Sequence, residues 1–184
     1  MPPISGRGVV VWFTGLSGAG KTTLCAAVAE RLLRRSAIVA VLDGDELRRS
    51  VHADLGYSRS DRDENIRRIG LMAETLAAQH TIVLVAAISP YRTMRDAIRR
   101  RASAFVEVYV NAPLATCVLR DTKGLYRRAL KGEIADFTGI SAPYEPPLAP
   151  DVECNTAEES VDRSADKVMR VLTRTIELQS MRTD

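Results

Sequence analysis

Residues 9–25 read VVVWFTGLSGAGKTTLC, and this stretch decides the fold. A five-residue apolar run, residues 9–13, leads directly into residues 15–22, which fit the P-loop pattern G-x-x-x-x-G-K-[ST]. Glycines at these spacings let the backbone turn sharply and bring successive N–H groups around a phosphate. The helix that begins at Lys21 adds the positive end of its dipole. The stretch therefore predicts a nucleoside triphosphate site between a buried strand and a helix.

The residues of this loop have distinct expected tasks. Lys21 is expected to reach the β- and γ-phosphates of ATP, and Thr22 to ligate Mg²⁺. The alternative is a glycine-rich turn with a chance Gly-Lys-Thr, which the preceding strand and the amphipathic helix 22–34 disfavour. The predicted ATP-binding residues of the loop are Gly15, Leu16, Ser17, Gly18, Ala19, Gly20, Lys21, Thr22 and Thr23.

Composition bounds the class of protein. The 184 residues are 46% hydrophobic and 27% charged, with a net charge of +3, which is typical of one globular domain over 1–184. That charge is too small to predict binding of nucleic acid or membrane, and no apolar run approaches transmembrane length. The first eight residues lack the apolar core of a signal peptide. The three distant cysteines, Cys25, Cys117 and Cys154, are expected to be buried thiols in a reducing compartment, so we expect a cytoplasmic protein.

Apolar runs alternate with helical patterns along the chain. Strands are expected at 9–13, 37–42, 81–88, 104–110 and 152–154. Helices are expected at 22–34, 46–53, from Ser60 or Asp61 to Gln79, and at 91–101, 114–120, 125–131 and 160–178. This order predicts an α/β fold of the P-loop NTPase type, with a parallel sheet flanked by helices on both faces and ligands at the carboxyl ends of the strands. The Gly- and Pro-rich segment 132–150 is expected to be a lid or flap.

Acidic residues indicate which kind of P-loop protein this is. No N-K-x-D guanine motif occurs, and the strand 81–88 leads to Ser-Pro without a Walker B acid. Asp43 and Asp45 instead follow the second strand, where a small-molecule kinase places carboxylates that orient Mg²⁺ or accept the proton of a hydroxyl. A tight turn with a helix cap is the alternative for these two acids. Arg62 and Asn65 share a helical face that either presents donors to an anion or is a solvated, ion-paired surface.

Several segments together resemble one family, adenylylsulfate kinase (APS kinase). In family order they are GLSGAGKTT (15–23), LDGD (42–45), DLGYSRSDRDENIRRIG (54–70), ISPYR (88–92), RDTKGLYRRALKGEI (120–134) and FTGISAPYE (137–145). The resemblance implies transfer of the ATP γ-phosphoryl group to the ribose 3′-hydroxyl of adenosine 5′-phosphosulfate (APS), giving PAPS and ADP in sulfate activation. It also implies a Mg²⁺ requirement, a homodimer and a functional association with ATP sulfurylase.

The resemblance also implies roles for individual residues. Thr22 and Asp43 are expected at the metal, and Asp45 is favoured over Asp43 as the base. Ser89 belongs to a motif for which a phosphoserine intermediate has been proposed, but direct transfer needs none, so it is interpreted as a pocket residue more than a nucleophile. The candidate catalytic residues are Asp45, Asp43, Lys21 and Ser89. Arg120 joins the ATP site from the lid. The substrate-binding residues implied are Asp45, Arg48, Tyr57, Arg62, Asn65, Ile88, Ser89, Lys123, Leu125 and Phe137, with Phe137 over the APS adenine and Tyr57 opposite it.

Three positions depart from the usual family pattern: Glu46, Arg49 and Tyr57. None removes a group that the chemistry needs, since Tyr57 keeps a stacking ring. Two other functions stay open. One is a kinase for another small hydroxyl compound, and the other is a silent nucleotide-binding module, which would be expected to have lost a P-loop lysine or threonine or an aspartate.

Overall fold

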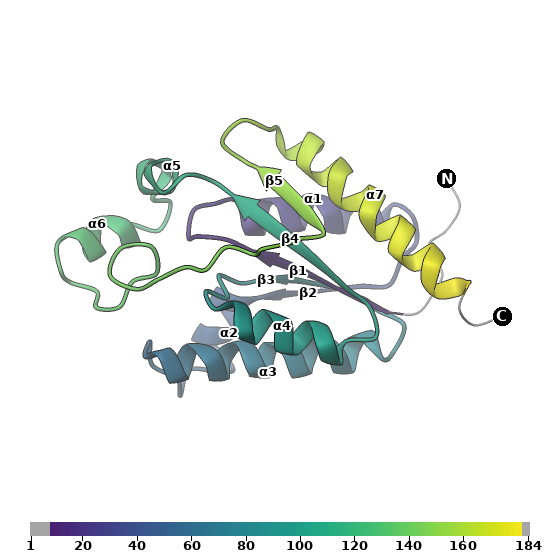
Figure 1. The fold of residues 1–184 in the computed structure, drawn as a ribbon, viewed down its shortest axis with the longest axis horizontal. Helices are drawn as coiled ribbons and strands as arrows, with labels where there is room; N and C mark the ends of the chain where they lie inside the picture. Colours follow the sequence, from purple (N-terminus) through teal and green to yellow (C-terminus); the bar gives the residue numbers. More distant parts are fainter. Residues whose placement is uncertain (1–7, 182–184) are drawn as a thin grey trace.

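The computed structural model describes residues 8–181 and contains a five-stranded sheet between two helical layers (Figure 1). All neighbouring strands are parallel, in the order β2-β3-β1-β4-β5. The strands are β1 (Val9–Thr14), β2 (Val39–Asp43), β3 (Ile82–Ala86), β4 (Phe105–Asn111) and β5 (Val152–Asn155). The helices are α1 (Lys21–Leu33), α2 (Gly44–Arg49), α3 (Arg59–Ala77), α4 (Arg92–Arg101), α5 (Leu114–Arg120), α6 (Leu125–Leu130) and α7 (Val161–Ser180). The predicted α/β class is confirmed.

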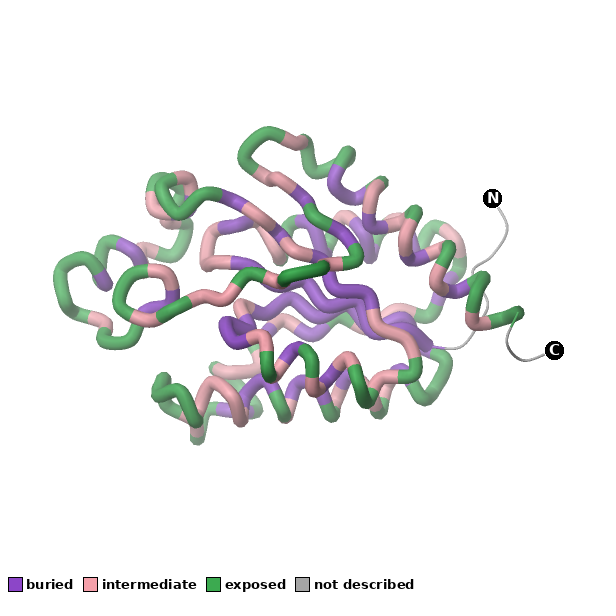
Figure 2. The backbone as a smooth tube through the Cα atoms, in the orientation of Figure 1, coloured by how far each residue is buried: buried purple, intermediate pink, exposed green. Residues whose placement is uncertain are grey.

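The alternation of side chains along β1 explains the two layers. Val9, Val11 and Phe13 face one way and pack with α1 and α7, while Val10 and Trp12 face the other way and pack with α3 and α4. β1 and β3 are buried at every position, as strands covered on both sides must be. Figure 2 shows this continuous buried centre and the more exposed helices around it. The sheet therefore forms a rigid base for the loops at its carboxyl end.

The starts of α2 and α3 differ from the sequence-based expectation for reasons that the local hydrogen bonds explain. The cap of α3 is Ser58, neither Ser60 nor Asp61, because Ser58 and Asp61 form a reciprocal capping box at the spacing that this motif requires. α2 begins at Gly44 because the Asp43 carboxylate already accepts hydrogen bonds from the amides of Asp45 and Glu46. Helix 46–53 was thus predicted too late in the chain.

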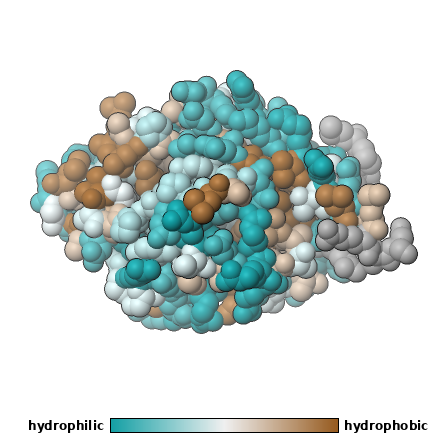
Figure 3. Space-filling model, in the orientation of Figure 1, coloured by the Kyte–Doolittle hydropathy of each residue, from teal (hydrophilic) through white to brown (hydrophobic). Residues whose placement is uncertain are grey.

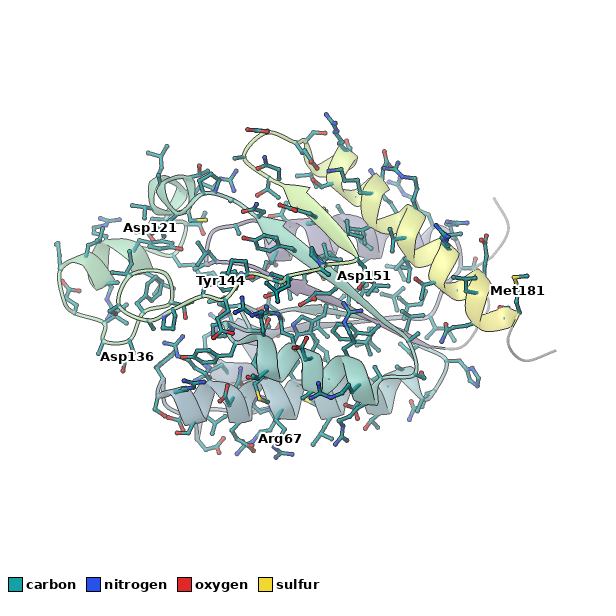
Figure 4. The ribbon with its side chains drawn as sticks, in the orientation of Figure 1. Arg67, Asp121, Asp136, Tyr144, Asp151 and Met181 are labelled. Atoms are coloured by element: carbon teal, nitrogen blue, oxygen red, sulfur yellow. The ribbon has the colours of Figure 1, made fainter. Side chains whose placement is uncertain are left out.

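A lid region projects beyond the sheet at the end where the strands finish. It comprises α5, α6 and the segment 132–150, which returns across β4, where Tyr144 and Asp151 mark its course (Figure 4). As expected, this segment forms no helix or strand within the described chain, apart from a single bridge between Thr138 and Ala142. Its tip carries Asp136 (Figure 4). Figure 3 shows hydrophobic surface gathered over this end of the molecule, where Leu119 and Leu130 are exposed.

Other expectations concern the cysteines and the membrane. Cys25, Cys117 and Cys154 are all buried and free, as predicted. Within residues 8–181 no helix has the length and apolar character needed to cross a bilayer. The expectation about a signal peptide falls almost entirely on residues 1–7, which lie outside the described residues.

Candidate active site

The P-loop follows β1 and is shaped by glycines in conformations that other residues avoid. Gly15 has φ 155°, and a Cβ there would lie 2.4 Å from the carbonyl oxygen of Val110 on the neighbouring strand. Gly20 has φ 100° and caps α1. The side chain of Lys21 folds back over the loop, and its ammonium donates to the carbonyls of Gly15 at 3.0 Å and Leu16 at 2.8 Å. The glycine conformations and the two hydrogen bonds of Lys21 together set the shape of the loop.

Lys21 is held in an unusual electrostatic state. Burial lowers the pKa of its ammonium from 10.5 to about 8, although the nearby Asp45 carboxylate opposes that shift. The phosphate oxygens of a bound polyphosphate would place negative charge beside this buried ammonium and stabilise its charged form. Lys21 is thus suited to bind an anion, and its pKa lies within the range where pH affects binding.

Asp43, the last residue of β2, and Asp45, in α2, bind different partners. Thr22 Oγ1 donates to Asp43 Oδ2 at 2.9 Å, while Asp43 Oδ1 caps α2. Asp43 is therefore the helix cap that the alternative predicted, and its second carboxylate oxygen accepts from the P-loop threonine. Asp45 instead forms an ion pair with Lys123 of the lid. Burial alone would raise the pKa of Asp45, but the hydrogen-bonded Lys123 ammonium, with help from Lys21, holds that pKa below its usual value.

The predicted substrate-binding arginines lie on two helices, Arg48 on α2 and Arg62 in the amino-terminal part of α3. Arg62 Nε donates to the Tyr57 carbonyl at 2.9 Å, and its two terminal nitrogens bind the Asp136 carbonyl and the Thr138 hydroxyl of the flap. The Arg48 guanidinium lies 4.8 Å from the centre of the Tyr57 ring, which is 62% exposed. Arg62 therefore connects the α3 wall to the flap in this structure.

Ser89 lies deep at the base of the site, just after β3. It is 1% exposed, with φ 43°, and its hydroxyl accepts from Trp12 Nε1 at 2.9 Å and lies 3.0 Å from Thr14 Oγ1. Thr14 Oγ1 is also within 3.0 Å of the Tyr144 hydroxyl, which belongs to the flap. Neutral partners surround the Ser89 hydroxyl, and none of them is a general base. This geometry agrees with a pocket role better than with a nucleophilic one.

Arg120 and Tyr126 attach the lid to the P-loop. Arg120 donates to the carbonyls of Gly18 at 3.2 Å and Thr156 at 2.6 Å. The Tyr126 hydroxyl donates to the Ser17 carbonyl at 3.0 Å, and its ring meets Phe137 edge-on with centroids 5.0 Å apart. Phe137, in the segment 132–150, is consequently buried against α6.

One cavity of about 1160 Å³ is lined by side chains from the P-loop, α2, α3, the segment after β3 and the lid. This exceeds the range of about 300–1,000 Å³ that is usual for a single-ligand site, so there is room for two ligands. Its basic lining residues are Lys21, Arg48, Arg49, Arg62, Arg120, Lys123 and Arg128, and its acidic ones are Asp45, Glu133, Asp136 and Glu159. The excess of basic groups favours anionic ligands.

The cavity includes most residues that the sequence singled out. Of the predicted site residues, Gly15, Leu16, Ala19 and Asp43 are not among its lining residues, while Ser17, Gly18, Gly20, Lys21, Thr22, Thr23, Asp45, Arg48, Tyr57, Arg62, Asn65, Ile88, Ser89, Arg120, Lys123, Leu125 and Phe137 are. Sequence reasoning missed Thr156, which follows β5 and donates to the Ala19 carbonyl at 2.6 Å. It also missed His52, which contacts Asn65. Neither residue belongs to a recognisable motif, although a polar residue after a parallel strand was a usable signal for Thr156.

Fold and site together define a P-loop phosphotransferase of the small-molecule kinase type. Residues 7–155 match the family described as Adenylylsulphate kinase. The chain is 56% identical over 166 residues to the adenylyl-sulfate kinase of Synechococcus sp. (strain JA-3-3Ab), covering 90% of this chain and 94% of the relative. Identity to the adenylyl-sulfate kinase of Halothermothrix orenii is 52%, covering 90% of each. The chain therefore belongs to the adenylylsulfate kinase family.

Solved structures agree. The APS kinase of Mycobacterium tuberculosis in complex with AMPPNP and APS superposes with a TM-score of 0.87 at 44% identity, covering 94% of this chain and 99% of that one. A gluconokinase from Sinorhizobium meliloti, at 18% identity and a TM-score of 0.59, shares the fold alone.

Proposed function

We propose that this protein is an ATP-dependent adenylyl-sulfate kinase that phosphorylates the 3′-hydroxyl of APS, giving PAPS and ADP for sulfate activation. The observation that carries the proposal is the single cavity, which joins a complete P-loop to a basic wall on α2, α3 and the lid. Family membership narrows the acceptor to APS, since the relatives of more than 50% identity are named adenylyl-sulfate kinases. The activity assay described below also distinguishes a kinase that acts on another hydroxyl compound.

ATP is proposed to bind at the P-loop end of the cavity. The loop amides and Lys21 would hold the β- and γ-phosphates, as in other P-loop proteins. Arg120 and Thr156 approach the same loop from the lid side and from the end of β5. AMPPNP, which stands in for ATP, is bound by the Mycobacterium tuberculosis relative.

Mg²⁺ is proposed to accompany ATP and to be held by Thr22 and Asp43. The donor set fits, because both are oxygen donors and are already 2.9 Å apart. Within residues 8–181 no cluster of three His, Cys, Asp or Glu could hold a metal by itself. That agrees with a Mg²⁺ site, in which waters and phosphate oxygens supply the remaining ligands. When bound, the ion neutralises charge that develops on the transferred phosphoryl group.

APS is proposed to occupy the opposite end of the cavity, along α3 and the lid. Arg48, Arg62 and Asn65 offer donors for its phosphosulfate and ribose, while Phe137 and Tyr57 are proposed to flank its adenine. Arg62 is bound to flap carbonyl and hydroxyl oxygens in this structure, so we expect its contacts to rearrange as substrate enters. Ile88, Ser89 and Leu125, which line the cavity, would complete the pocket.

The chemical step is a direct in-line transfer. The ribose 3′-oxygen forms a bond to the γ-phosphorus as the bond from that phosphorus to the β,γ-bridging oxygen breaks, and ADP leaves with the bonding electrons. The hydroxyl proton goes to a carboxylate, for which Asp45 is favoured over Asp43. A strong base is not required, because the transition state is largely dissociative. Asp45 therefore serves mainly to orient the hydroxyl, and Lys123, paired with it, is placed to neutralise charge.

Wider features of the protein follow as proposals. Buried, free cysteines support a reducing, cytoplasmic location. A single domain over 1–184 and a homodimer are also proposed. The APS kinase of Thiobacillus denitrificans is described as hexameric, and this chain covers 30% of it at 31% identity. A functional association with ATP sulfurylase, which makes APS, completes the proposal.

The test is incubation of the purified protein with Mg-ATP and APS, followed by separation of PAPS and ADP. Asp45→Asn is expected to lower the rate by about 10²-fold, the scale on which misplacing a reacting group slows transfer. Lys123→Ala should also lower it, while Lys131→Ala, a lid lysine outside the cavity lining, serves as the matched control. Phosphorylation of another hydroxyl acceptor in place of APS would show that the protein is a kinase for that compound and would overturn the proposal. ATP binding without any transfer would favour the silent module.

A further inference from the structure

A buried histidine supports the polar wall of the cavity. His52, in the segment between α2 and α3, is 3% exposed, and Asn65 on α3 is 6% exposed. His52 Nδ1 lies 2.9 Å from Asn65 Oδ1. The backbone of His52 is itself fixed, since its amide donates to the Leu47 carbonyl at 2.8 Å and its carbonyl accepts from Leu55 at 3.1 Å. The imidazole is thus a rigid support placed behind a residue that lines the cavity.

The contact determines which way the Asn65 amide faces. An amide oxygen only accepts, so His52 Nδ1 must carry the proton of this hydrogen bond. The oxygen end of the amide is thereby occupied, and the Nδ2 end is left with its two donors. Among residues 8–181 no protein acceptor is found for Nδ2, yet this nitrogen is not one of the buried atoms without a partner. Nδ2 therefore remains accessible from the cavity.

The NH₂ group of Asn65 adds two hydrogen-bond donors to a cavity wall that already carries the guanidinium groups of two arginines. Arg62 lies one helical turn before Asn65 on the same face of α3, and Arg48 approaches from α2. A reversed amide would instead present an acceptor beside these guanidinium groups and repel an anionic oxygen. We propose that His52 is a positioning residue, which locks the Asn65 amide so that its NH₂ group faces an oxygen of the acceptor substrate. This inference rests on the proposed function, because that substrate is taken to be APS.

The test uses two substitutions of similar size. In His52→Asn the side-chain NH₂ is attached to Cγ as Nδ1 is in histidine, so a donor to Asn65 Oδ1 is retained. In His52→Leu that donor is lost while an apolar side chain fills the space. We expect His52→Leu to raise the KM for APS by about two- to tenfold, the range of one net hydrogen bond. The KM for ATP should stay within about twofold, and His52→Asn should restore the wild-type KM for APS.

A double-mutant cycle separates positioning from general packing. If His52 acts through Asn65, His52→Leu should add nothing to the KM for APS once Asn65→Ala is present. Equal increases in His52→Leu and His52→Asn, or a fully additive double variant, would overturn the proposal. His52→Met replaces the leucine variant if the latter fails to fold. Failure of the proposed function would be visible separately, as wild-type protein that forms no PAPS, and the same cycle would then be measured by equilibrium binding of APS.

Discussion

Replacing Arg95 with methionine is expected to destabilise the fold strongly, because its guanidinium is a buried junction between the sheet and two active-site loops. Arg95 is 1% exposed. Its Nε donates to Glu107 at 2.8 Å, and its terminal nitrogens donate to the carbonyls of Ser89 at 2.6 Å and Glu145 at 2.7 Å. Methionine can fill much of the space but donates no hydrogen bond. Arg95→Met thus leaves two carbonyls and part of a buried carboxylate without partners.

The expected loss of folding free energy in Arg95→Met depends on which partners Glu107 keeps. Removing one partner of a buried ion pair costs about 3–5 kcal/mol, and the low end applies because Arg99 stays 3.3 Å from Glu107. In a chain of this size, a loss of about 3 kcal/mol lowers Tm by roughly 6–12 °C. Arg101→Met is a matched control on the same helix, since the exposed pair that Arg101 makes with Glu74 should contribute at most about 1 kcal/mol.

Thermal and urea unfolding of both variants at pH 7 measures the difference. The KM for APS, taken at 25 °C where Arg95→Met is still folded, should also rise, because Ser89 loses the hydrogen bond to its carbonyl. A Tm loss in Arg95→Met no larger than in Arg101→Met would refute the reasoning. It would mean that the fold relaxes or admits water around Glu107 at little cost.

Three further outcomes are expected. Gly15→Ala should abolish binding of an ATP analogue in calorimetry, since its Cβ would lie 2.4 Å from the Val110 carbonyl; binding within about twofold of wild type would contradict this. The pKa of Lys21, about 8, lies below its ordinary 10.5, so the free enzyme loses this proton as pH rises through 8. ATP affinity should therefore fall above pH 8 and binding at pH 9 should take up a proton, which calorimetry in two buffers of different ionisation enthalpy detects or excludes. Chelation of Mg²⁺ should stop transfer, and Asp43→Asn should raise the Mg²⁺ concentration for half-maximal rate by about tenfold, whereas an unchanged requirement would remove Asp43 from the metal site.

Features with a short-range cause could be predicted from the sequence. The fully apolar runs of β1 and β3 predicted buried parallel strands, and the glycine spacing predicted the P-loop backbone. The cap of α3 is Ser58 and not the predicted Ser60 or Asp61, although the Ser58–Asp61 capping box is a local signal in the sequence. Errors of this kind concern boundaries and leave the topology intact.

The site beyond the P-loop could be predicted only as a list of residues. Family resemblance suggested Asn65 and Lys123 as site residues. It gave no reason to expect that His52 contacts Asn65 or that Asp45 pairs with Lys123. Thr156 was not found at all, since its importance depends on β5 ending next to the P-loop. These contacts join residues that are far apart in the sequence, so no local pattern encodes them.

The sequence by itself therefore determined the elements, the α/β class and the phosphate-binding loop, because steric limits on glycine and the burial of alternating side chains act over a few residues. Tertiary structure alone decided how the groups of the site pair. The strand order β2-β3-β1-β4-β5 brings the loops after β1, β2, β3 and β5 to one edge of the sheet. There, the ion pair of Asp45 with Lys123 and the buried bonds of Arg95 form because desolvated charges and carbonyls must find partners wherever the fold places them.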